Sequence, residues 1–199
     1  SQGEKSQHII QATLKKLKEY TPDYWTGYSY SWFGNMKARA FDGEGAADEL
    51  RTFAECFCLR NTFHVNGDQT KSGKSKFTYR PFTLEGNFAF ASGIQEMLLQ
   101  SHTGIVRVFP AIPAAWSDVS FDNLRAMGAF LVSAEKKEGK IVKLRIYPEQ
   151  GGKLRIAFPA DGSEVSVTGN EGDVTNEDGV YTIETRKGQW IDIKEKQSH

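Results

Sequence analysis

The chain has 199 residues, a length that suits one ordinary domain or two small ones. Hydrophobic residues make up 39% of it and aromatic residues 12%, which excludes a disordered chain and allows a substantial core. The 25 lysines and arginines balance 25 aspartates and glutamates, and no apolar run approaches the roughly 20 residues of a membrane span, so neither nucleic acid nor a membrane is expected as a partner.

The first hundred residues carry the apolar spacing of helices. Apolar residues recur at three- and four-residue intervals, and Thr21-Pro22, the Gly43–Gly45 region and Thr103-Gly104 interrupt the pattern. The predicted helices cover residues 9–20, 29–40, 46–59 and 86–101. The polar stretch 66–76 is rich in Gly, Ser and Lys, a composition typical of a mobile loop or of disorder.

From Ile105 onward the period changes to that of strands. Residues 106–113 predict a short extended segment followed by a turn. Further alternating or β-branched segments cover 129–135, 140–147, 153–158, 164–167, 180–184 and 189–193. Turn dipeptides separate them at Glu138-Gly139, Gly151-Gly152, Asp161-Gly162, Asp178-Gly179 and Lys187-Gly188. Five or six short antiparallel strands predict a small sandwich or meander.

Helices followed by strands, without βαβ alternation, predict an α+β chain. We place a helical segment at 1–103 and a β domain at 104–199. The second and fourth helices are apolar or small nearly all round, so each is expected to be covered on more than one side. The chain offers few elements to do this, and further helices or a partner chain are therefore expected to cover them.

The cysteines and histidines of the chain give little indication of metal binding or disulfide formation. Cys56 and Cys58 are interpreted as small helix residues, where a spacing of two prevents a mutual bridge or a shared metal. His64 and His102 are isolated from carboxylates in sequence and are interpreted as structural or exposed. Nothing indicates a metal site, and no cofactor is expected.

Glu85 is the main candidate for chemistry. It is a single acid among apolar and small residues, where a long loop enters a helix. This setting favours a carboxylate in a pocket. The alternative is an acid in the first helical turn that stabilises the helix dipole.

Four residues are candidates for substrate contact. Trp25 and Tyr28 belong to an aromatic cluster whose rings can stack on a ligand, while Trp32 of the same cluster is interpreted as core. Asn87 can bond a ligand hydroxyl or hold the loop of Glu85, and Arg80 can pair with Glu85, bind substrate or lie free on the surface.

Ordered blocks of residues resemble glycoside hydrolase family 95. They include Trp25-Thr26-Gly27-Tyr28-Ser29-Tyr30-Ser31-Trp32, Ala38-Arg39-Ala40-Phe41-Asp42-Gly43-Glu44-Gly45-Ala46 and Pro81-Phe82-Thr83-Leu84-Glu85-Gly86-Asn87-Phe88, followed by 94–102, 110–116 and 124–130. Their common order across about residues 26–130 is more specific than any single block.

The resemblance implies the fold and activity of that family. Its members are inverting α-L-fucosidases and related α-L-galactosidases, with an (α/α)6 catalytic barrel followed by a smaller β domain. It implies that residues 1–103 are the last part of such a barrel, covered by the rest of the parent chain, and that 104–199 are the C-terminal β domain. It also implies a glycan substrate and a secreted or periplasmic protein, although the residues themselves leave the compartment undetermined.

The resemblance gives Glu85 the position of an assisting aspartate in an Ile-Asp-Gly-Asn-Phe-Gly type motif. Inverting hydrolysis needs a general acid and a base system roughly 6.5–9.5 Å apart. The family's glutamate acid and its two water-positioning asparagines have no counterpart in this chain, so the segment by itself is expected to be inactive. Because Glu85 is one methylene longer than aspartate, a non-catalytic carbohydrate-binding or structural module is the alternative, and a stand-alone α+β protein is a third.

Overall fold

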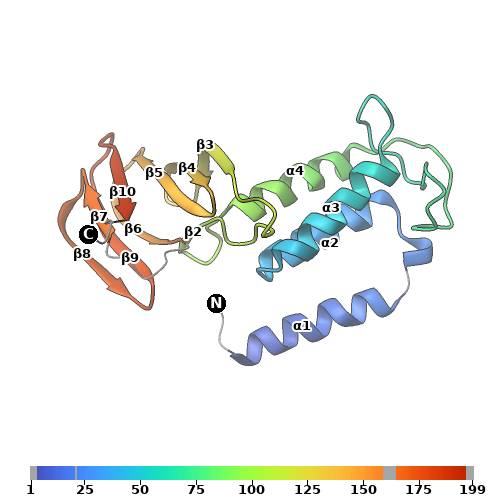
Figure 1. The fold of residues 1–199 in the computed structure, drawn as a ribbon, viewed down its shortest axis with the longest axis horizontal. Helices are drawn as coiled ribbons and strands as arrows, with labels where there is room; N and C mark the ends of the chain where they lie inside the picture. The colour runs from blue at the N-terminus through green and yellow to red at the C-terminus, as the bar shows by residue number, and fades with distance from the viewer. Residues whose placement is uncertain (1–3, 21, 159–164, 196–199) are drawn as a thin grey trace. The chain divides into compact units, whose positions relative to one another are not determined.

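The computed structural model describes residues 4–20, 22–158 and 165–195 (Figure 1). Contacts divide the chain into a helical unit, residues 1–97 with 111–113, and a β unit, residues 98–110 with 114–199. Each unit is described by itself. The order of helices before strands confirms the predicted α+β class.

The helical unit contains the four predicted α-helices. Their bounds are α1 Glu4–Glu19, α2 Gly27–Arg39, α3 Gly43–Phe57 and α4 Leu84–Leu98, with a 3-10 turn η1 at Pro22–Tyr24. The predicted end of α4 at residue 101 is wrong. Leu99 and Gln100 leave the helix to form β1 (Leu99–Gln100), which pairs with Val108 and Arg107, so strand pairing overrides the glycine stop at Gly104.

The core of the helical unit lies between α2 and α3. Asp42 begins α3 as its N-cap, accepting a 2.8 Å hydrogen bond from the Gly45 amide. One stripe of α3 is buried and meets Tyr30 of α2. The fully buried side chains of this stripe are Leu50, Phe53 and Phe57.

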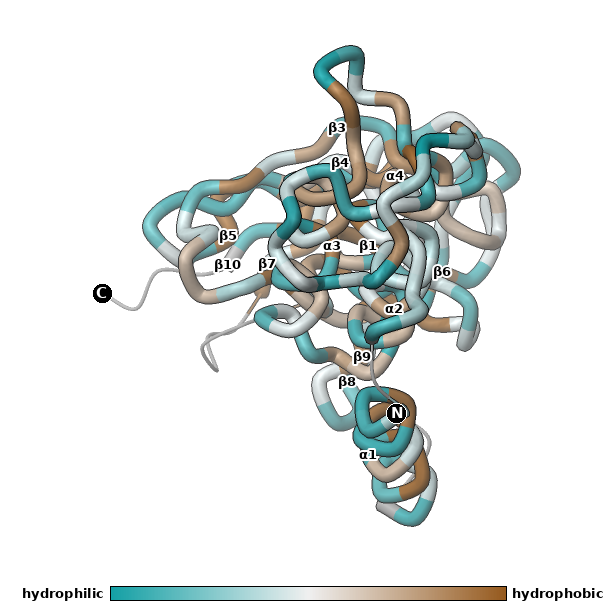
Figure 2. The backbone as a smooth tube through the Cα atoms, turned by 90° about the vertical axis from the view of Figure 1, so that its right-hand side faces the viewer, coloured by the Kyte–Doolittle hydropathy of each residue, from teal (hydrophilic) through white to brown (hydrophobic). Residues whose placement is uncertain are grey.

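Helix α1 is amphipathic. Its hydrophobic residues gather toward one side (Figure 2), and Leu14 is buried together with Phe33 and Ala40 of the α2 region. Ile9, in contrast, is 56% exposed. Helix α1 therefore packs through a narrow stripe only.

Loop 66–76 is held by side-chain hydrogen bonds, which contradicts its interpretation as disorder. Asp68 is buried, and its carboxylate accepts bonds of 2.8 Å from the hydroxyls of both Thr70 and Ser72. Burial raises the pKa of Asp68. These hydrogen bonds and one from the Lys74 backbone amide lower it by more than burial raises it, so the net pKa lies below its ordinary value. The Tyr30 hydroxyl donates to the Lys74 carbonyl at 2.6 Å and ties the loop to α2.

The β unit consists of two five-stranded sheets. Its other strands are β2 Val106–Val108, β3 Val119–Ala126, β4 Phe130–Lys137, β5 Lys140–Pro148, β6 Gly152–Ala157, β7 Val165–Thr168, β8 Glu171–Glu177, β9 Val180–Thr185 and β10 Ile191–Glu195. One sheet has the order β1-β2-β6-β9-β8 and the other β3-β4-β5-β10-β7. Among the described pairs β2 and β6 are parallel and the others antiparallel. The predicted small β-sandwich is confirmed.

Alternating strand residues form the core of the β unit. The fully buried members include Val132, Leu144, Ile146, Leu154, Ile156, Ile183 and Ile191. The two predicted turns that connect paired strands, Glu138-Gly139 between β4 and β5 and Asp178-Gly179 between β8 and β9, have positive φ at both central residues, 48° and 81° in the first and 50° and 78° in the second. This is the geometry of a two-residue turn that matches strand twist. The Asp161-Gly162 turn lies outside the described residues.

Strands β3 and β8 are absent from the sequence-based prediction. Strand β8 is largely polar, and β3 is interrupted by a register shift between Phe121 and Leu124, so neither presents a clean alternation. Each owes its extended backbone to pairing, with β4 and β9 respectively. Within the described residues no helix is long and apolar enough to span a bilayer.

Candidate functional site

Glu85 lies in the first turn of α4, and its side chain is exposed. It forms no hydrogen bond or ion pair with another described residue. Because the first turn of a helix carries unsatisfied amides and the positive end of the dipole, an acidic side chain interacts favourably with the helix at this position. Glu85 is therefore an accessible carboxylate on a rigid element, and not one enclosed by this chain.

The backbone on both sides of Glu85 is tied to the segment around His64. The His64 Nδ1 atom lies 2.8 Å from the Thr83 carbonyl oxygen and 2.8 Å from the Thr83 hydroxyl. A carbonyl only accepts, so Nδ1 carries a hydrogen and donates it. On the other side of Glu85, Asn87 accepts a 3.0 Å bond from the His64 backbone amide and donates a 2.9 Å bond to the Thr62 carbonyl.

Two glycines pack directly against the His64 ring. A Cβ atom at Gly86 would lie 2.6 Å from His64 Cγ, and one at Gly27 would lie 2.5 Å from His64 Cδ2 and from Phe57 Cβ. Real Cβ atoms do not approach other atoms so closely. The imidazole is thus enclosed between the starts of α2 and α4 and is fully buried.

The surroundings of His64 favour its neutral form. Burial lowers the pKa of the imidazole, and the Thr83 carbonyl and the Glu85 charge raise it only in part, so the net pKa lies below its ordinary value. The Nε2 atom is buried without a hydrogen-bond partner among the described residues. A protonated ring would leave one N–H unsatisfied there.

This neutral histidine predicts a loss of stability in mild acid. The unfolded chain binds a proton at His64 near pH 6.5, whereas the folded chain binds it only at lower pH. The free energy of unfolding should therefore fall as pH drops below about 6.5, with a slope of at most ~1.4 kcal/mol per pH unit, the limit for one proton. Urea unfolding followed by circular dichroism between about pH 5.5 and 8 checks this.

The matched comparison uses two histidine variants. His64→Phe should flatten this pH dependence, while His102→Gln, which changes an exposed histidine, should leave it intact. Equal slopes for the unaltered chain and His64→Phe would contradict the assignment of the effect to His64.

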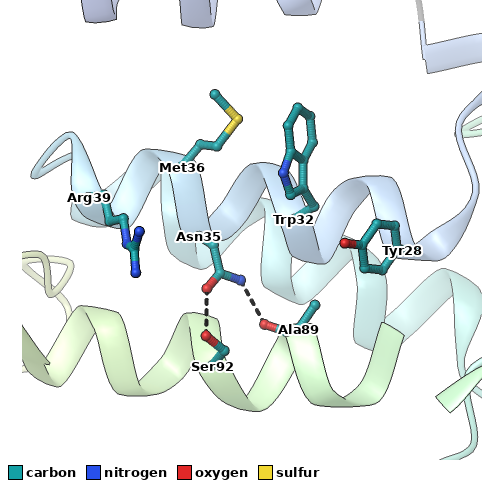
Figure 3. Close-up of a pocket in the computed structure, with 7 residues that line it drawn as sticks. All are labelled: Tyr28, Trp32, Asn35, Met36, Arg39, Ala89 and Ser92. Atoms are coloured by element: carbon teal, nitrogen blue, oxygen red, sulfur yellow. Dashed lines mark hydrogen bonds between the residues drawn. The ribbon is translucent and has the colours of Figure 1, made fainter. Parts of the chain in front are cut away.

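A groove of about 310 Å³ lies between α2 and α4 (Figure 3). Asn35 crosses it, donating a 2.7 Å bond to the Ala89 carbonyl and accepting a 2.9 Å bond from the Ser92 hydroxyl. Arg39 pairs with Glu96 of α4 at 2.9 Å. The groove is lined by Tyr28, Trp32, Asn35, Met36, Arg39, Ala89 and Ser92.

The other predicted substrate residues lie in different settings. Tyr28 lines the groove and is 41% exposed. Trp25 packs edge-on against Tyr30 and Phe33, with ring centroids 5.4 Å apart in each case, and is partly buried against the core. Arg80 is exposed and donates a 2.7 Å bond to Gln69, not to Glu85. Substrate contact by these residues stays a prediction.

Trp32 and Cys58 differ from their predicted settings. Trp32 was expected in the core but is 40% exposed and lines the groove, because α4 covers only part of that face of α2. Cys58 was expected inside a helix but follows α3 with extended backbone and pairs with His64 in an isolated β-bridge. Burial raises the pKa of the Cys58 thiol to about 11, and both cysteines are free. Within the described residues no group of three or more His, Cys, Asp or Glu is arranged to hold a metal ion.

Comparison with known proteins identifies the chain's family. The family model described as the glycosyl hydrolase family 95 catalytic domain matches residues 1–98, and the model of the glycoside hydrolase family 95 C-terminal domain matches residues 100–193. The fold and these matches define the class of the chain, a helical segment similar to the catalytic domain of this family followed by a β segment similar to its C-terminal domain. The chain belongs to glycoside hydrolase family 95.

A curated relative supports this assignment. The protein named Alpha-L-fucosidase 2 from Arabidopsis thaliana is 32% identical over 151 residues. These residues are 75% of this chain but 17% of the relative. The chain therefore spans less than a fifth of that protein's length in the aligned region.

Sequence reasoning missed the contribution of His64 because its partners are distant in sequence. Thr83 and Asn87 lie 19 and 23 residues away from it. The signal that points to a tight contact is the pair of glycines at helix starts, Gly27 and Gly86, where a residue with better helix propensity would ordinarily stand.

Proposed function

We propose that the full-length protein containing this chain hydrolyses terminal α-linked L-fucosyl or L-galactosyl residues of glycans with inversion, and that Glu85 belongs to the base side of the reaction. The proposal rests on one observation, the exposed Glu85 carboxylate in the first turn of α4 with Thr83 and Asn87 fixed on either side of it. Family membership and the name of the Arabidopsis relative support it.

In this proposal residues 1–103 supply the last part of an (α/α)6 barrel and residues 104–199 the C-terminal β domain. Support comes from the apolar side chains that α2 and α4 leave exposed in this chain. Phe88 is 69% exposed, and Leu84 and Trp32 are 41% and 40% exposed. Further helices of the parent barrel would bury such side chains and bring the general acid to the opposite side of the scissile bond.

The roles of the remaining candidates follow from their contacts. Tyr28, in the groove beside α4, is proposed to contact a sugar ring. Asn87 uses both polar atoms of its amide to hold Thr62 and His64, which favours a supporting role. Trp25, which packs against the core, and Arg80, which is bonded to Gln69, are weaker candidates for direct contact.

Glu85→Gln in the full-length protein tests the proposal. With an α-L-fucosyl disaccharide as substrate and released fucose as readout, kcat should fall by about 100-fold to 10,000-fold, because the amide cannot accept a proton from the attacking water. Glu85→Asp keeps the carboxylate and should retain far more activity than Glu85→Gln.

The matched control is Glu55→Gln, which makes the same change at an exposed position of α3. It should leave kcat unaltered. If Glu85→Gln turns over substrate at the unaltered rate, Glu85 has no part in the mechanism.

A further inference from the structure

We propose that His64 is the positioning residue for Glu85, holding the start of α4 so that the Glu85 carboxylate faces the reaction site in one fixed orientation. This inference rests on the proposed function of Glu85. It concerns a residue that makes no direct contact with a substrate, since its ring is fully buried.

The hydrogen bonds of His64 bracket Glu85 on both sides. Its ring donates to the Thr83 carbonyl two residues before Glu85, and its backbone amide donates to Asn87 two residues after it. A third hydrogen bond joins the two backbones, with the Thr83 amide donating to the His64 carbonyl at 3.3 Å. Three bonds from one residue thus fix both ends of the segment that carries the carboxylate.

Packing against the His64 ring also restrains the start of α4. Gly86, directly after Glu85, lies against the imidazole with no space for a methyl group. Gly27 lies against the Nε2 and Cδ2 atoms of the ring, and the Phe53 ring lies 5.1 Å from the imidazole between centroids. The planar ring therefore sets the distance between the starts of α2 and α4. A flexible side chain in its place would not hold this distance constant.

The Thr83 hydroxyl extends the same network. It lies 2.8 Å from His64 Nδ1 and donates a 3.2 Å bond to Asn66. Thus the ring, the loop entering at residue 66 and the start of α4 are joined through one hydroxyl. A catalytic group must be held within about 0.5 Å of its productive position, and a misplacement of about 1 Å costs on the order of 100-fold in rate.

The test is a double-mutant cycle in the full-length protein with His64→Phe and Glu85→Gln, again on an α-L-fucosyl disaccharide. Phe keeps a planar aromatic ring at this position but cannot donate to Thr83. Alone, His64→Phe should lower kcat by about 10-fold to 100-fold with KM unchanged. In the Glu85→Gln background it should change kcat by less than about 2-fold, because there is no longer a carboxylate to position. A purely structural role would reduce the active fraction by the same factor in both backgrounds.

A second variant separates geometry from folding. His64→Asn places an amide N–H near the position of Nδ1 and should recover part of the kcat lost in His64→Phe. If His64→Phe does not fold, as judged by circular dichroism, the same cycle is run with Thr83→Val, which removes the hydroxyl at nearly constant volume and should show the same loss of effect in the Glu85→Gln background.

The outcomes separate the two proposals. An unaltered kcat in Glu85→Gln overturns the proposed function and the positioning role together. A reduced kcat in Glu85→Gln, combined with an equal effect of the His64 or Thr83 variant in both backgrounds or with no effect at all, overturns only the positioning role.

Discussion

Glu49→Ala is expected to lower the free energy of unfolding of the helical unit by about 3–5 kcal/mol. Glu49 of α3 forms a 2.7 Å ion pair with Lys37 of α2, and the two side chains are only 8% and 11% exposed. Removing the carboxylate leaves a buried ammonium without its counter-ion. Its nitrogen then keeps a cation–π contact with the Phe33 ring, whose centroid is 4.9 Å away. A cation over an aromatic ring returns only about 0.5–2 kcal/mol.

The matched control is an exposed ion pair on the same helix. Asp48 and Arg51 are paired at 3.4 Å with side chains 70% and 62% exposed, so Asp48→Ala should cost less than about 1 kcal/mol. The double variant Lys37→Met with Glu49→Leu removes both charges and should recover most of the stability. Urea unfolding followed by helical circular dichroism gives all of these values. Equal losses for Glu49→Ala and Asp48→Ala would refute the role of the buried pair.

Gly86→Ala is expected to destabilise the helical unit by about 2–3 kcal/mol, although alanine is the better helix former. On propensity alone the change would stabilise α4 by about 1 kcal/mol. The new methyl group would meet the His64 ring, which is fully buried and has little room to move because it also packs against Gly27 and the Phe53 ring. Overpacking therefore outweighs propensity.

Two further variants check this explanation. Ala91→Gly changes a single methyl group at an exposed position of the same helix and should cost only about 1 kcal/mol. His64→Ala in the Gly86→Ala background removes the obstructing ring, so the effects of the two substitutions should be strongly non-additive. Additive losses would show that the His64 ring is not what Gly86 accommodates. Thermal unfolding measures each variant.

The local pattern of the chain predicted most of its elements. Three- and four-residue spacing located α1 to α4, and turn dipeptides such as Glu138-Gly139 located hairpins, because both depend on neighbours along the chain. The same patterns failed for β3 and β8, whose extended backbone depends on partner strands more than on their own composition.

Some features of the candidate site were likewise indicated by the sequence, and others depend on the folded structure. The order of residues around Glu85 indicated the family and placed the carboxylate at a helix start. Loop 66–76 looked disordered by composition, yet Asp68 organises it through hydrogen bonds that composition does not encode. Trp32 looked like core on its helical stripe, yet it lines a groove because of where α4 lies.

The sequence by itself determined the α+β class, the helical and β halves of the chain, and Glu85 as the candidate carboxylate. Only the tertiary structure decided what supports that carboxylate: a buried neutral His64, two glycines against its ring, and Asn87 hydrogen-bonded to the backbone of Thr62 and His64. The physical reason is that helix and strand periodicity is a property of adjacent residues. Burial and hydrogen-bond partners, in contrast, join residues about 20 positions apart, and they exist only once the chain has folded.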